Sequence, residues 1–385
     1  MLNKNLLKID NITGFSKAQN YVKEYKKKYP RADIVSLGIG DVSKPIVKPI
    51  IDAMHKAVDD LADMKSFKGY GNYYGIDELR ETILKKEYKK YDFTKEEIYI
   101  SDGTKSDSTN ILELFDKNSK ILLADIIYPI YRNGAYALSR KIYTTPLDTD
   151  FKMKIPNKHY DIIYICSPNN PIGNAYTYND LKKWINYCLK EKAIIIYDNV
   201  YECFINDKDI PKSIYEIKGA KKCAIELRSF SKKASFTGLR CSYFVLPKEI
   251  DNKLFKERTI NRFNGASYVA QIAALAYYQK DSQELIKKNL KLYKENIKYL
   301  KDSFIKMGFK VIGGDNSPYL WIKIKENIDS FSYFKKLLHD INVIVVPGII
   351  FGKKGDKYFR VSGLGNIDNS KEAIKRIKKY YEKKS

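Results

Sequence analysis

Residues 192–201 read KAIIIYDNVY, an unbroken apolar run that ends at a carboxylate, Asp198. Four other apolar, β-branched runs of strand length end in polar or glycine-containing loops and are separated by helical patterns. They are EEIYISDG at 96–103, SKILLADIIYP at 119–129, YDIIYICSPNNP at 160–171 and KKCAIELRSFSK at 221–232. Continuous apolar strands separated by helices are typical of a mostly parallel sheet that is buried on both faces. The sequence therefore predicts an α/β fold.

The chain has 385 residues, which is enough for two domains. Its pattern turns helical from Ser267 to about Met307, and the remainder mixes alternating strands with helices, as a smaller α+β domain would. The short strand pattern ADIVSLGIGD at 32–41 has no partner nearby in sequence, so we expect the N-terminal segment to pack on that smaller domain. The predicted division is an N-terminal arm with part of the small domain, a large domain, and a connecting helix with the rest of the small domain, at residues 1–45, 46–270 and 271–385.

The formal net charge is +24, from 70 lysines and arginines against 46 aspartates and glutamates. Such a charge is compatible with an acidic or nucleic-acid partner. The lysines are spread along the whole chain, however, and they concentrate on probable helix faces, so exposed helix surfaces explain them better. We expect no nucleic-acid partner.

Cysteine and histidine usage does not indicate a metal site or a disulfide framework. The five cysteines are scattered and form no CxxC pair, and the three histidines lie far apart. No segment approaches the ~18 uncharged apolar residues that a membrane helix needs, and the first residues, MLNKNLLKIDNITG, lack the apolar core of a signal peptide. We expect a cytoplasmic protein that does not contact membranes.

Ligands of open parallel sheets bind beyond the carboxyl ends of the strands, so the polar side chains that follow the apolar runs are the candidates for a site. They are Thr104, Lys105, Tyr128, Asn170, Asp198, Tyr201, Ser229, Ser231, Lys232 and Arg240. The segment after Gly103 opens a helix, where backbone N–H groups can bind an anion, although a plain helix cap is the alternative. Two serine hydroxyls and the fork of an arginine are further suited to a phosphate.

Three of these candidates keep a structural alternative when each is taken alone. Asp198 emerges from a buried strand, so it must be paired, either with a neighbouring cap or ion pair or with a cation such as a protonated ring nitrogen. Asn170 lies in a turn, where asparagine is usually selected for the backbone. Tyr128 is either a core aromatic residue or a ring that stacks on a flat ligand.

The stretch ELRSFSKKASFTGLR, residues 226–240, raises the same question for Lys232. Most lysines of this chain are expected to be surface charges. Lys232, however, follows an apolar run where burial is expected, and its neighbours indicate a phosphate and a planar cation. A desolvated amine can form a Schiff base, and together these groups are what pyridoxal phosphate requires. The adjacent Lys233 is expected to be an ordinary lysine.

The motifs SPNNPIG, YDNVY, SFSKKASFTGLR and FRVSG, in this order, resemble those of the class I and II aminotransferases of pyridoxal phosphate fold type I. The motifs SLGIGD, GYG, SDGTKSD, CSPNNPIG, FNGAS and VPGIIFG resemble more narrowly the LL-diaminopimelate aminotransferase subfamily. The resemblance implies a homodimer with shared active sites that transfers an amino group between an L-amino acid and a 2-oxo acid. It further implies pyridoxal 5'-phosphate as the cofactor, LL-diaminopimelate with 2-oxoglutarate and glutamate as substrates, and a place in lysine biosynthesis.

The resemblance also assigns roles to residues of this chain. Lys232 would form the Schiff base and move a proton, Asp198 would hold the ring nitrogen protonated, and Tyr201 would complete the catalytic set. The ring would contact Asn170, Tyr201 and Tyr128. The phosphate would be held by Thr104, Lys105, Ser229, Ser231 and Arg240, with Tyr70 from the other subunit. Arg360 would bind the substrate α-carboxylate. Other residues implied to line the substrate site are Gly40, Tyr73, Lys105, Tyr128, Asn170 and Asn264.

Two departures from the subfamily pattern concern the substrate. Residues 69–75 read GYGNYYG, so Tyr73 occupies the position where the subfamily has a glutamate that recognises the distal end of the substrate. The tyrosine that the subfamily has near its N-terminus has no clear counterpart in NITGFSKAQ, residues 11–19. Two alternatives therefore stay open: an aminotransferase for a different amino acid, and a lyase or synthase of the same fold.

Overall fold

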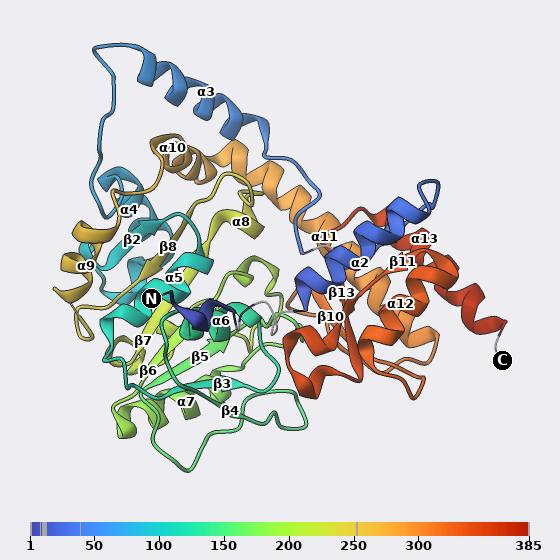
Figure 1. Cartoon of the computed structure of the whole chain (residues 1–385). Coiled ribbons are helices and arrows are strands. Elements are labelled where there is room, and N and C mark those ends of the chain that lie inside the picture. Colours follow the sequence, from blue (N-terminus) through green and yellow to red (C-terminus); the bar gives the residue numbers. More distant parts are fainter. Residues whose placement is uncertain (1, 8, 10–13, 39, 252, 384–385) are drawn as a thin grey trace.

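The computed structural model describes residues 2–7, 9, 14–38, 40–251 and 253–383. It contains a large sheet and a small sheet, which lie in two units joined by a long helix (Figure 1). Among the described residues, no helix has both the length and the apolar character needed to cross a membrane.

The large sheet has seven strands in the order β2-β8-β7-β6-β5-β3-β4. Neighbouring strands from β7 to β4 run parallel, and β8 is antiparallel to both of its neighbours. The strand bounds are β2 (Ile98–Ser101), β3 (Ile121–Ala124), β4 (Ile142–Thr145), β5 (Ile162–Cys166), β6 (Ile194–Asp198), β7 (Ala224–Ser229) and β8 (Ser242–Val245). All five apolar runs singled out in the sequence form strands of this sheet, and the predicted α/β fold class is confirmed.

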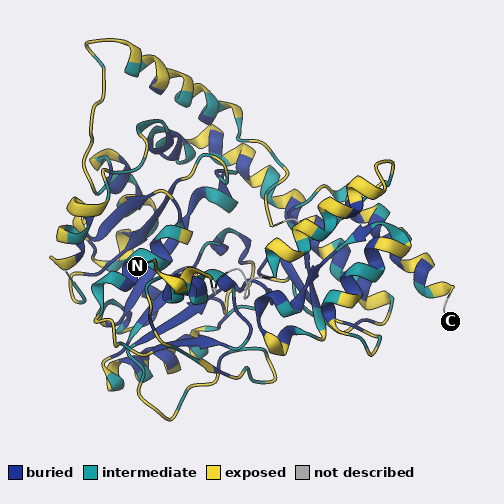
Figure 2. Ribbon diagram, viewed as in Figure 1, coloured by how far each residue is buried: buried dark blue, intermediate teal, exposed yellow. Residues whose placement is uncertain are grey.

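The apolar character of the central strands follows from burial on both faces. Every residue of β3, β5 and β7 is buried (Figure 2). Burying an isoleucine or leucine side chain contributes roughly 1.5–3 kcal/mol, so these strands hold the sheet together. The helices around the sheet are α3 (Lys48–Ala62), α4 (Asp77–Ile83), α5 (Thr104–Asn110), α6 (Pro129–Ala137), α7 (Tyr178–Glu191), α8 (Phe230–Lys233), α9 (Leu254–Arg262) and α10 (Tyr268–Tyr277).

The smaller unit is built from both ends of the chain, as the fold prediction has it. Its antiparallel sheet has the order β12-β13-β10-β9, with bounds β9 (Val311–Gly313), β10 (Tyr319–Lys323), β12 (Val346–Pro347) and β13 (Tyr358–Ser362). The N-terminal strand β1 (Val35–Ser36) pairs in parallel with β11 (Val343–Ile344). Three helices complete this unit: α2 (Phe15–Lys28), α12 (Ser330–Ile341) and α13 (Ile367–Glu382).

The long helical stretch expected after Ser267 forms two helices rather than one. Helix α10 ends at Tyr277, Gln279 is extended, and α11 (Lys280–Lys306) then runs toward the smaller unit. Alanines of α10 such as Ala273 lie in the core of the large unit. The predicted boundary at 270/271 thus falls inside α10, and the three-part division of the chain stays a prediction.

A turn after β5 touches the small sheet in a close contact of backbone with backbone. Gly173 has φ +81°, and a Cβ placed on it would lie 2.0 Å from the carbonyl oxygen of Tyr319. Gly313 approaches the same turn from the other side, because its Cβ would lie 2.7 Å from the Cα of Gly173. Only glycine has both the allowed conformation and the space. This contact fixes the turn that carries Asn170 against the small sheet.

We therefore expect Gly173→Ala to destabilise the protein. A strained left-handed residue costs roughly 1–3 kcal/mol, and the collision with Tyr319 adds to it. The control is Gly238→Ala, because a Cβ at Gly238 meets no atom within 4 Å. Thermal and denaturant unfolding of both variants measure the effect. Equal stability of the two variants would show that the turn does not depend on this close contact.

Candidate active site

A cavity of about 820 Å³ lies beyond the carboxyl ends of the parallel strands, between the large unit and the small one. It is lined by twelve of the fifteen residues that the sequence and the resemblance single out. These are Gly40, Thr104, Lys105, Tyr128, Asn170, Asp198, Tyr201, Ser229, Ser231, Lys232, Arg240 and Arg360. Residues from the end of β2 to β13 thus meet at one place, which is the geometry expected for parallel strands.

Asp198 is the last residue of β6, and it is 6% exposed. Its Oδ2 accepts a hydrogen bond from the hydroxyl of Tyr131 on α6, whereas Oδ1 has no partner among the described residues. Burial raises the pKa of Asp198 to about 6, although the Tyr131 hydroxyl and the backbone N–H of Val200 lower it. A buried carboxylate oxygen without a partner fits a ligand that brings an N–H donor with positive charge.

A second unpartnered group lies at the start of α5. The hydroxyl of Thr104 is buried and has no hydrogen-bond partner among the described residues. Gly103 before it has φ +147°, and its Cβ would lie 2.0 Å from Nη2 of Arg240, so only glycine lets the guanidinium come this close. The hydroxyl of Ser231 lines the same cavity. Two hydroxyls and a guanidinium at one end of a cavity fit a phosphate group.

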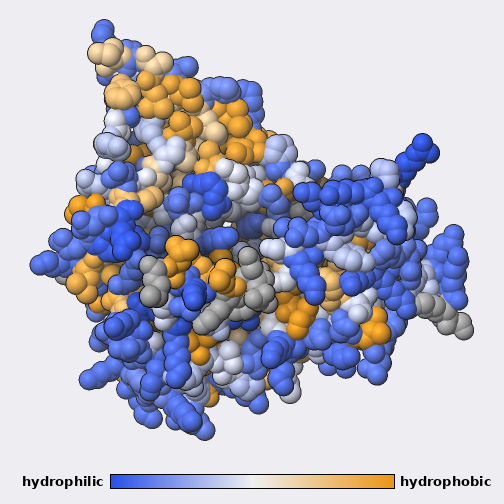
Figure 3. Space-filling model, in the orientation of Figure 1, coloured by the Kyte–Doolittle hydropathy of each residue, from blue (hydrophilic) through white to orange (hydrophobic). Residues whose placement is uncertain are grey.

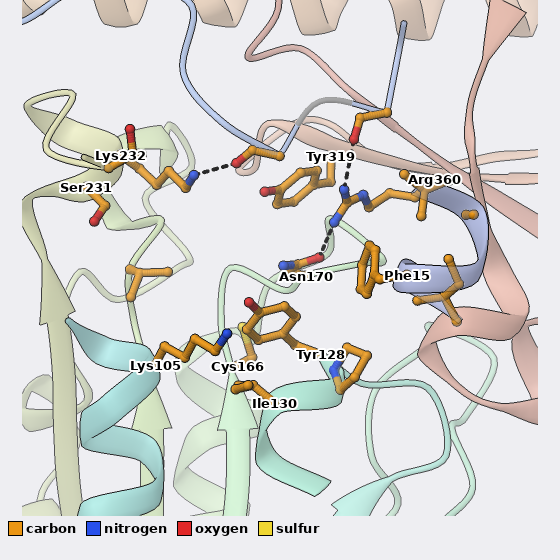
Figure 4. Close-up of a pocket in the computed structure, with 18 of the residues that line it drawn as sticks. Phe15, Lys105, Tyr128, Ile130, Cys166, Asn170, Ser231, Lys232, Tyr319 and Arg360 are labelled. Atoms are coloured by element: carbon orange, nitrogen blue, oxygen red, sulfur yellow. Dashed lines mark hydrogen bonds between the residues drawn. The ribbon is translucent and has the colours of Figure 1, made fainter. Parts of the chain in front are cut away.

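Lys232 and Lys105 both extend their amines into the cavity (Figure 4). Lys232 lies on the short helix α8, directly after β7, and its Nζ donates to the carbonyl oxygen of Gly40. The Lys232 amine therefore lies between the proposed phosphate-binding end of the cavity and the segment that follows β1.

Arg360 lies on β13 of the small sheet, and its guanidinium points into the cavity (Figure 4). Nη1 donates to Oδ1 of Asn170 at 2.8 Å, and Nη2 donates to the carbonyl oxygen of Gly38 at 3.3 Å. The Tyr319 ring lies 4.5 Å from the guanidinium carbon. Arg360 is 3% exposed, and among the described residues its hydrogen bonds go to an amide oxygen and a backbone carbonyl rather than to a carboxylate, so it can bind the carboxylate of a ligand.

Asn170 and Tyr201 connect the two ends of the cavity. Nδ2 of Asn170 donates to the hydroxyl of Tyr201 at 3.4 Å, and that hydroxyl contacts the hydroxyl of Tyr319 at 3.0 Å. Tyr128 caps α6, and its half-buried ring faces the same space (Figure 4). The hydrogen-bonding chain therefore runs from the small sheet, through Asn170, to the loop after β6.

Three residues implied by the resemblance lie outside the cavity of this chain: Tyr70, Tyr73 and Asn264. Tyr70 is 92% exposed and Tyr73 is 37% exposed, and Asn264 is also exposed. Their two loops are adjacent, because a Cβ on Gly265 would lie 3.0 Å from the carbonyl oxygen of Asn72. Tyr73 and Asn264 thus lie on neighbouring loops, outside the cavity of their own chain.

Among the cavity residues that sequence reasoning did not find are Tyr131, Tyr319 and Phe15. Tyr131 follows Tyr128 by three residues at the start of a helix, and this spacing places both on one face, which was a usable signal. Tyr319 lies in an alternating strand pattern that gives no sign of a site. Phe15 lines the cavity from α2, whereas residues 11–13 of the segment expected to lack the substrate tyrosine lie outside the described residues.

The polar and charged groups of the cavity agree with the chemistry of pyridoxal phosphate. Asp198 can face the ring nitrogen, Thr104 and Arg240 the phosphate, and Lys232 the reactive carbonyl carbon. An α/β fold that carries these groups at the strand ends defines a pyridoxal phosphate enzyme of fold type I.

Comparison with known proteins identifies the family of this chain. The family described as aminotransferase class I and II matches residues 32–377. The LL-diaminopimelate aminotransferase of Bacteroides thetaiotaomicron is 40% identical over 407 residues that cover 99% of each chain. That of Lawsonia intracellularis is 39% identical over 402 residues that cover 98% of each. The structure of the LL-diaminopimelate aminotransferase from Chlamydomonas reinhardtii matches with a TM-score of 0.90, 35% identity and 95% coverage of each chain. The chain therefore belongs to the class I and II aminotransferases, which use pyridoxal phosphate.

We predict that Asp198→Asn changes the pH dependence of stability in the cofactor-free protein. The folded-state pKa lies above its ordinary value, so the contribution of Asp198 to stability is fully present below about pH 4 and is lost as the pH rises through about 6. A pKa raised from 3.8 to about 6 corresponds to about 3 kcal/mol. The variant should therefore unfold at a higher temperature than the wild type at pH 8.

The difference in unfolding temperature should shrink toward pH 4.5, where the wild-type carboxyl group is mostly protonated. Asp107, whose pKa burial raises to about 7, is present in both proteins and cancels in the comparison. The same variant should bind pyridoxal phosphate at least tenfold more weakly, because it loses the charge that faces the ring nitrogen. A stability difference that does not vary with pH would contradict the assignment.

Proposed function

We propose that the protein transfers an amino group between LL-diaminopimelate and 2-oxoglutarate, with glutamate as the other product. The named relatives at 39–40% identity support this substrate. The observation that carries the chemistry is the convergence of Lys232, Asp198 and Arg360 on one cavity. Family membership favours transamination over the lyase or synthase alternative.

Pyridoxal phosphate, when bound, supplies the carbonyl carbon that takes up the amino group and a ring that stabilises negative charge at the substrate Cα. Nζ of Lys232 would bind the cofactor and would then move a proton at the substrate Cα. Asp198 would keep a proton on the ring nitrogen through Oδ1, which has no partner among the described residues. Asn170 and Tyr201 would hold the ring oxygen, and Tyr128 would lie against the ring. The phosphate would be held by Thr104, Lys105, Ser229, Ser231 and Arg240.

Arg360 binds the substrate α-carboxylate in a bidentate contact. Its Nη1 is held by Asn170, and its guanidinium lies against the ring of Tyr319, so its position is fixed before substrate enters. Gly40 leaves room for the substrate beside it, because a Cβ there would lie 3.5 Å from Nη2 of Arg360. Orientation by a fixed arginine lowers the entropic cost of reaching the reactive geometry.

A homodimer with shared active sites would bring in the residues that this chain leaves outside its cavity. Helix α3 and the loop after it expose large apolar side chains, which Figure 3 shows as an apolar region above the large unit. They include Val58, Met64 (96% exposed), Phe67 and Tyr70. An exposed apolar region of this kind supports an interface between copies of the chain. Tyr70, Tyr73 and Asn264 would then reach the partner's cavity.

The protein is proposed to work in the cytoplasm. All five cysteines are free in the structure, and four of them are buried. A reducing compartment suits a chain whose thiols are core side chains.

A second candidate function is transamination of a different amino acid. Asp198 is the one carboxylate among the residues described as lining the cavity, so no acidic side chain there pairs with a distal ammonium. The wall beside Arg360 is apolar and includes Phe15, Val22, Phe334, Ile344, Val346 and Ile350. Together with Tyr73 at the subfamily's glutamate position, this favours a donor with an apolar or aromatic side chain.

Glutamate formation from 2-oxoglutarate with a panel of amino donors separates the two candidates. No turnover of LL-diaminopimelate beside rapid turnover of another donor would contradict the first.

For Arg360→Lys we expect KM for the amino donor to rise roughly 100-fold, with a smaller change in kcat. A lysine cannot form the bidentate contact with a carboxylate, although it keeps the charge. Arg262→Lys is the matched control, because the Arg262 side chain is 63% exposed and lies outside the cavity. Steady-state kinetics at several donor concentrations separate the two constants. An unchanged KM would mean that another group binds the substrate carboxylate.

For Tyr73→Glu we expect kcat/KM for LL-diaminopimelate to increase about tenfold, because the new carboxylate can pair with the distal ammonium. Tyr73→Gln is the control, since it has the same length as glutamate without the charge. The gain requires that Tyr73 reaches the cavity of a partner subunit. Gel filtration with light scattering therefore accompanies the kinetics. A dimer in which the glutamate has no more effect than the glutamine would contradict the assigned position of residue 73.

A further inference from the structure

Five charged residues form a buried ion cluster directly behind the cavity: Glu87, Glu202, Glu226, Arg228 and Lys233. Their side chains are 14% exposed or less, and all five lie in the described part of the chain. None of them lines the cavity. The cluster therefore has no direct contact with a ligand bound in the cavity. Direct ligand binding does not explain why these five charges are buried together.

Lys233 lies at the centre of this ion cluster. Its Nζ is 3.0 Å from Oε1 of Glu87 and 3.2 Å from Oε1 of Glu202. The ammonium also lies 4.9 to 5.4 Å from the centres of three aromatic rings, those of Phe230, Tyr243 and Tyr277. The side chain is 2% exposed. The prediction that Lys233 is an ordinary lysine is therefore wrong, because the sequence does not show that Glu87 comes within reach.

Arg228 and Glu87 close the cluster. Nη2 of Arg228 lies 2.7 Å from Oε2 of Glu87 and 3.4 Å from Oε1 of Glu202. The hydroxyls of Tyr243 and Tyr278 donate to the two oxygens of Glu87. Burial alone would raise the pKa of Glu87, but Lys233 and Arg228 lower it well below its ordinary value. The two cations of the cluster are thus each paired with more than one carboxylate, and removing Lys233 or Arg228 would leave buried carboxylates without a counter-charge.

The cluster joins two segments that carry cavity residues. Lys233 follows Lys232 on α8, and Glu202 follows Tyr201 at the start of a 3₁₀ turn (Glu202–Phe204). The ion pair between Lys233 and Glu202 therefore links the residues next to Lys232 and Tyr201. Side chains at neighbouring positions point in different directions, so one member of each pair faces the cavity and the other faces the cluster.

We propose that Lys233 and Glu202 are positioning residues, whose buried ion pair sets the placement of Lys232 relative to Tyr201 and hence the orientation of the bound cofactor. The proposal rests on pyridoxal phosphate being held between these two residues, as the proposed function has it. Arg228 and Glu87 support the pair from behind. Arg360 lies on the small sheet, outside this linkage, so the binding of the substrate carboxylate does not depend on the cluster.

The variants that test this are Lys233→Met, Lys233→Arg, Glu202→Gln and the double variant Lys233→Met with Glu202→Gln. Lys222→Met is the matched control, because Lys222 is an exposed lysine near the start of β7 and outside the cavity. Each protein is measured as dialysed cofactor-free protein for unfolding temperature and as holoenzyme for three further properties. These are the dissociation constant of pyridoxal phosphate, the visible circular dichroism band of the bound cofactor, and KM and kcat for the amino donor.

Lys233→Met and Glu202→Gln should each weaken cofactor binding about tenfold, reduce the circular dichroism band and lower kcat by a similar factor, with KM nearly unchanged. The double variant should lose little more than either single variant, because both remove the same ion pair. Lys233→Arg should restore most of the band, since it keeps the charge.

Wild-type cofactor affinity and an unaltered band in both Lys233→Met and Glu202→Gln would overturn the proposal, even if their unfolding temperatures fall. If Lys233→Met does not fold, Glu202→Gln decides alone, because it leaves the contacts of Lys233 and Arg228 with Glu87 in place. A wild-type protein that binds no pyridoxal phosphate would overturn the proposed function itself, which is a different result from unaltered variants.

Discussion

The hydrogen bond from the Tyr131 hydroxyl to Asp198 satisfies only one oxygen of a buried carboxylate. The other oxygen lies at the end of β6 and has no hydrogen-bond partner among the described residues. A carboxylate in such surroundings is stable only as a neutral acid or beside a cation. Among the described residues no arginine or lysine pairs with Asp198, and an open cavity lies beside it instead. A cationic ring can therefore bind there.

The remaining site residues follow from where the strands end. Strands β2, β5, β6 and β7 run in the same direction, so the loops that leave their carboxyl ends meet at one edge of the sheet. The proposed cofactor contacts come from this edge, whereas Arg360 comes from the small sheet and hydrogen-bonds to Asn170. The close contact between Gly173 and Gly313 fixes the position of the turn after β5 relative to the small sheet. Cofactor chemistry and substrate binding are thus assigned to different units of the fold.

Sequence patterns could predict the residues whose position depends on one strand alone. Asp198 and Lys232 follow buried apolar runs, so their placement at the strand ends could be derived locally. Arg360 could be assigned only through the family resemblance, because nothing in its own strand indicates a cavity. Lys233 was misjudged, since its burial depends on Glu87, 146 residues away. Long-range partners of this kind leave no local pattern in the sequence.

The pairing of β1 with β11 has a consequence for the order in which the protein is made. Val35 pairs with Val343, so β1 has no partner strand until residue 343 has been synthesised. During synthesis the residues proposed to surround the cofactor, 104–240, leave the ribosome long before Arg360 does. Because domains fold as units and the N-terminal part of a chain emerges first, the large sheet can form while the small unit is still incomplete. The strand ends proposed to hold the cofactor can therefore be in place before the arginine proposed to bind the amino acid has been made.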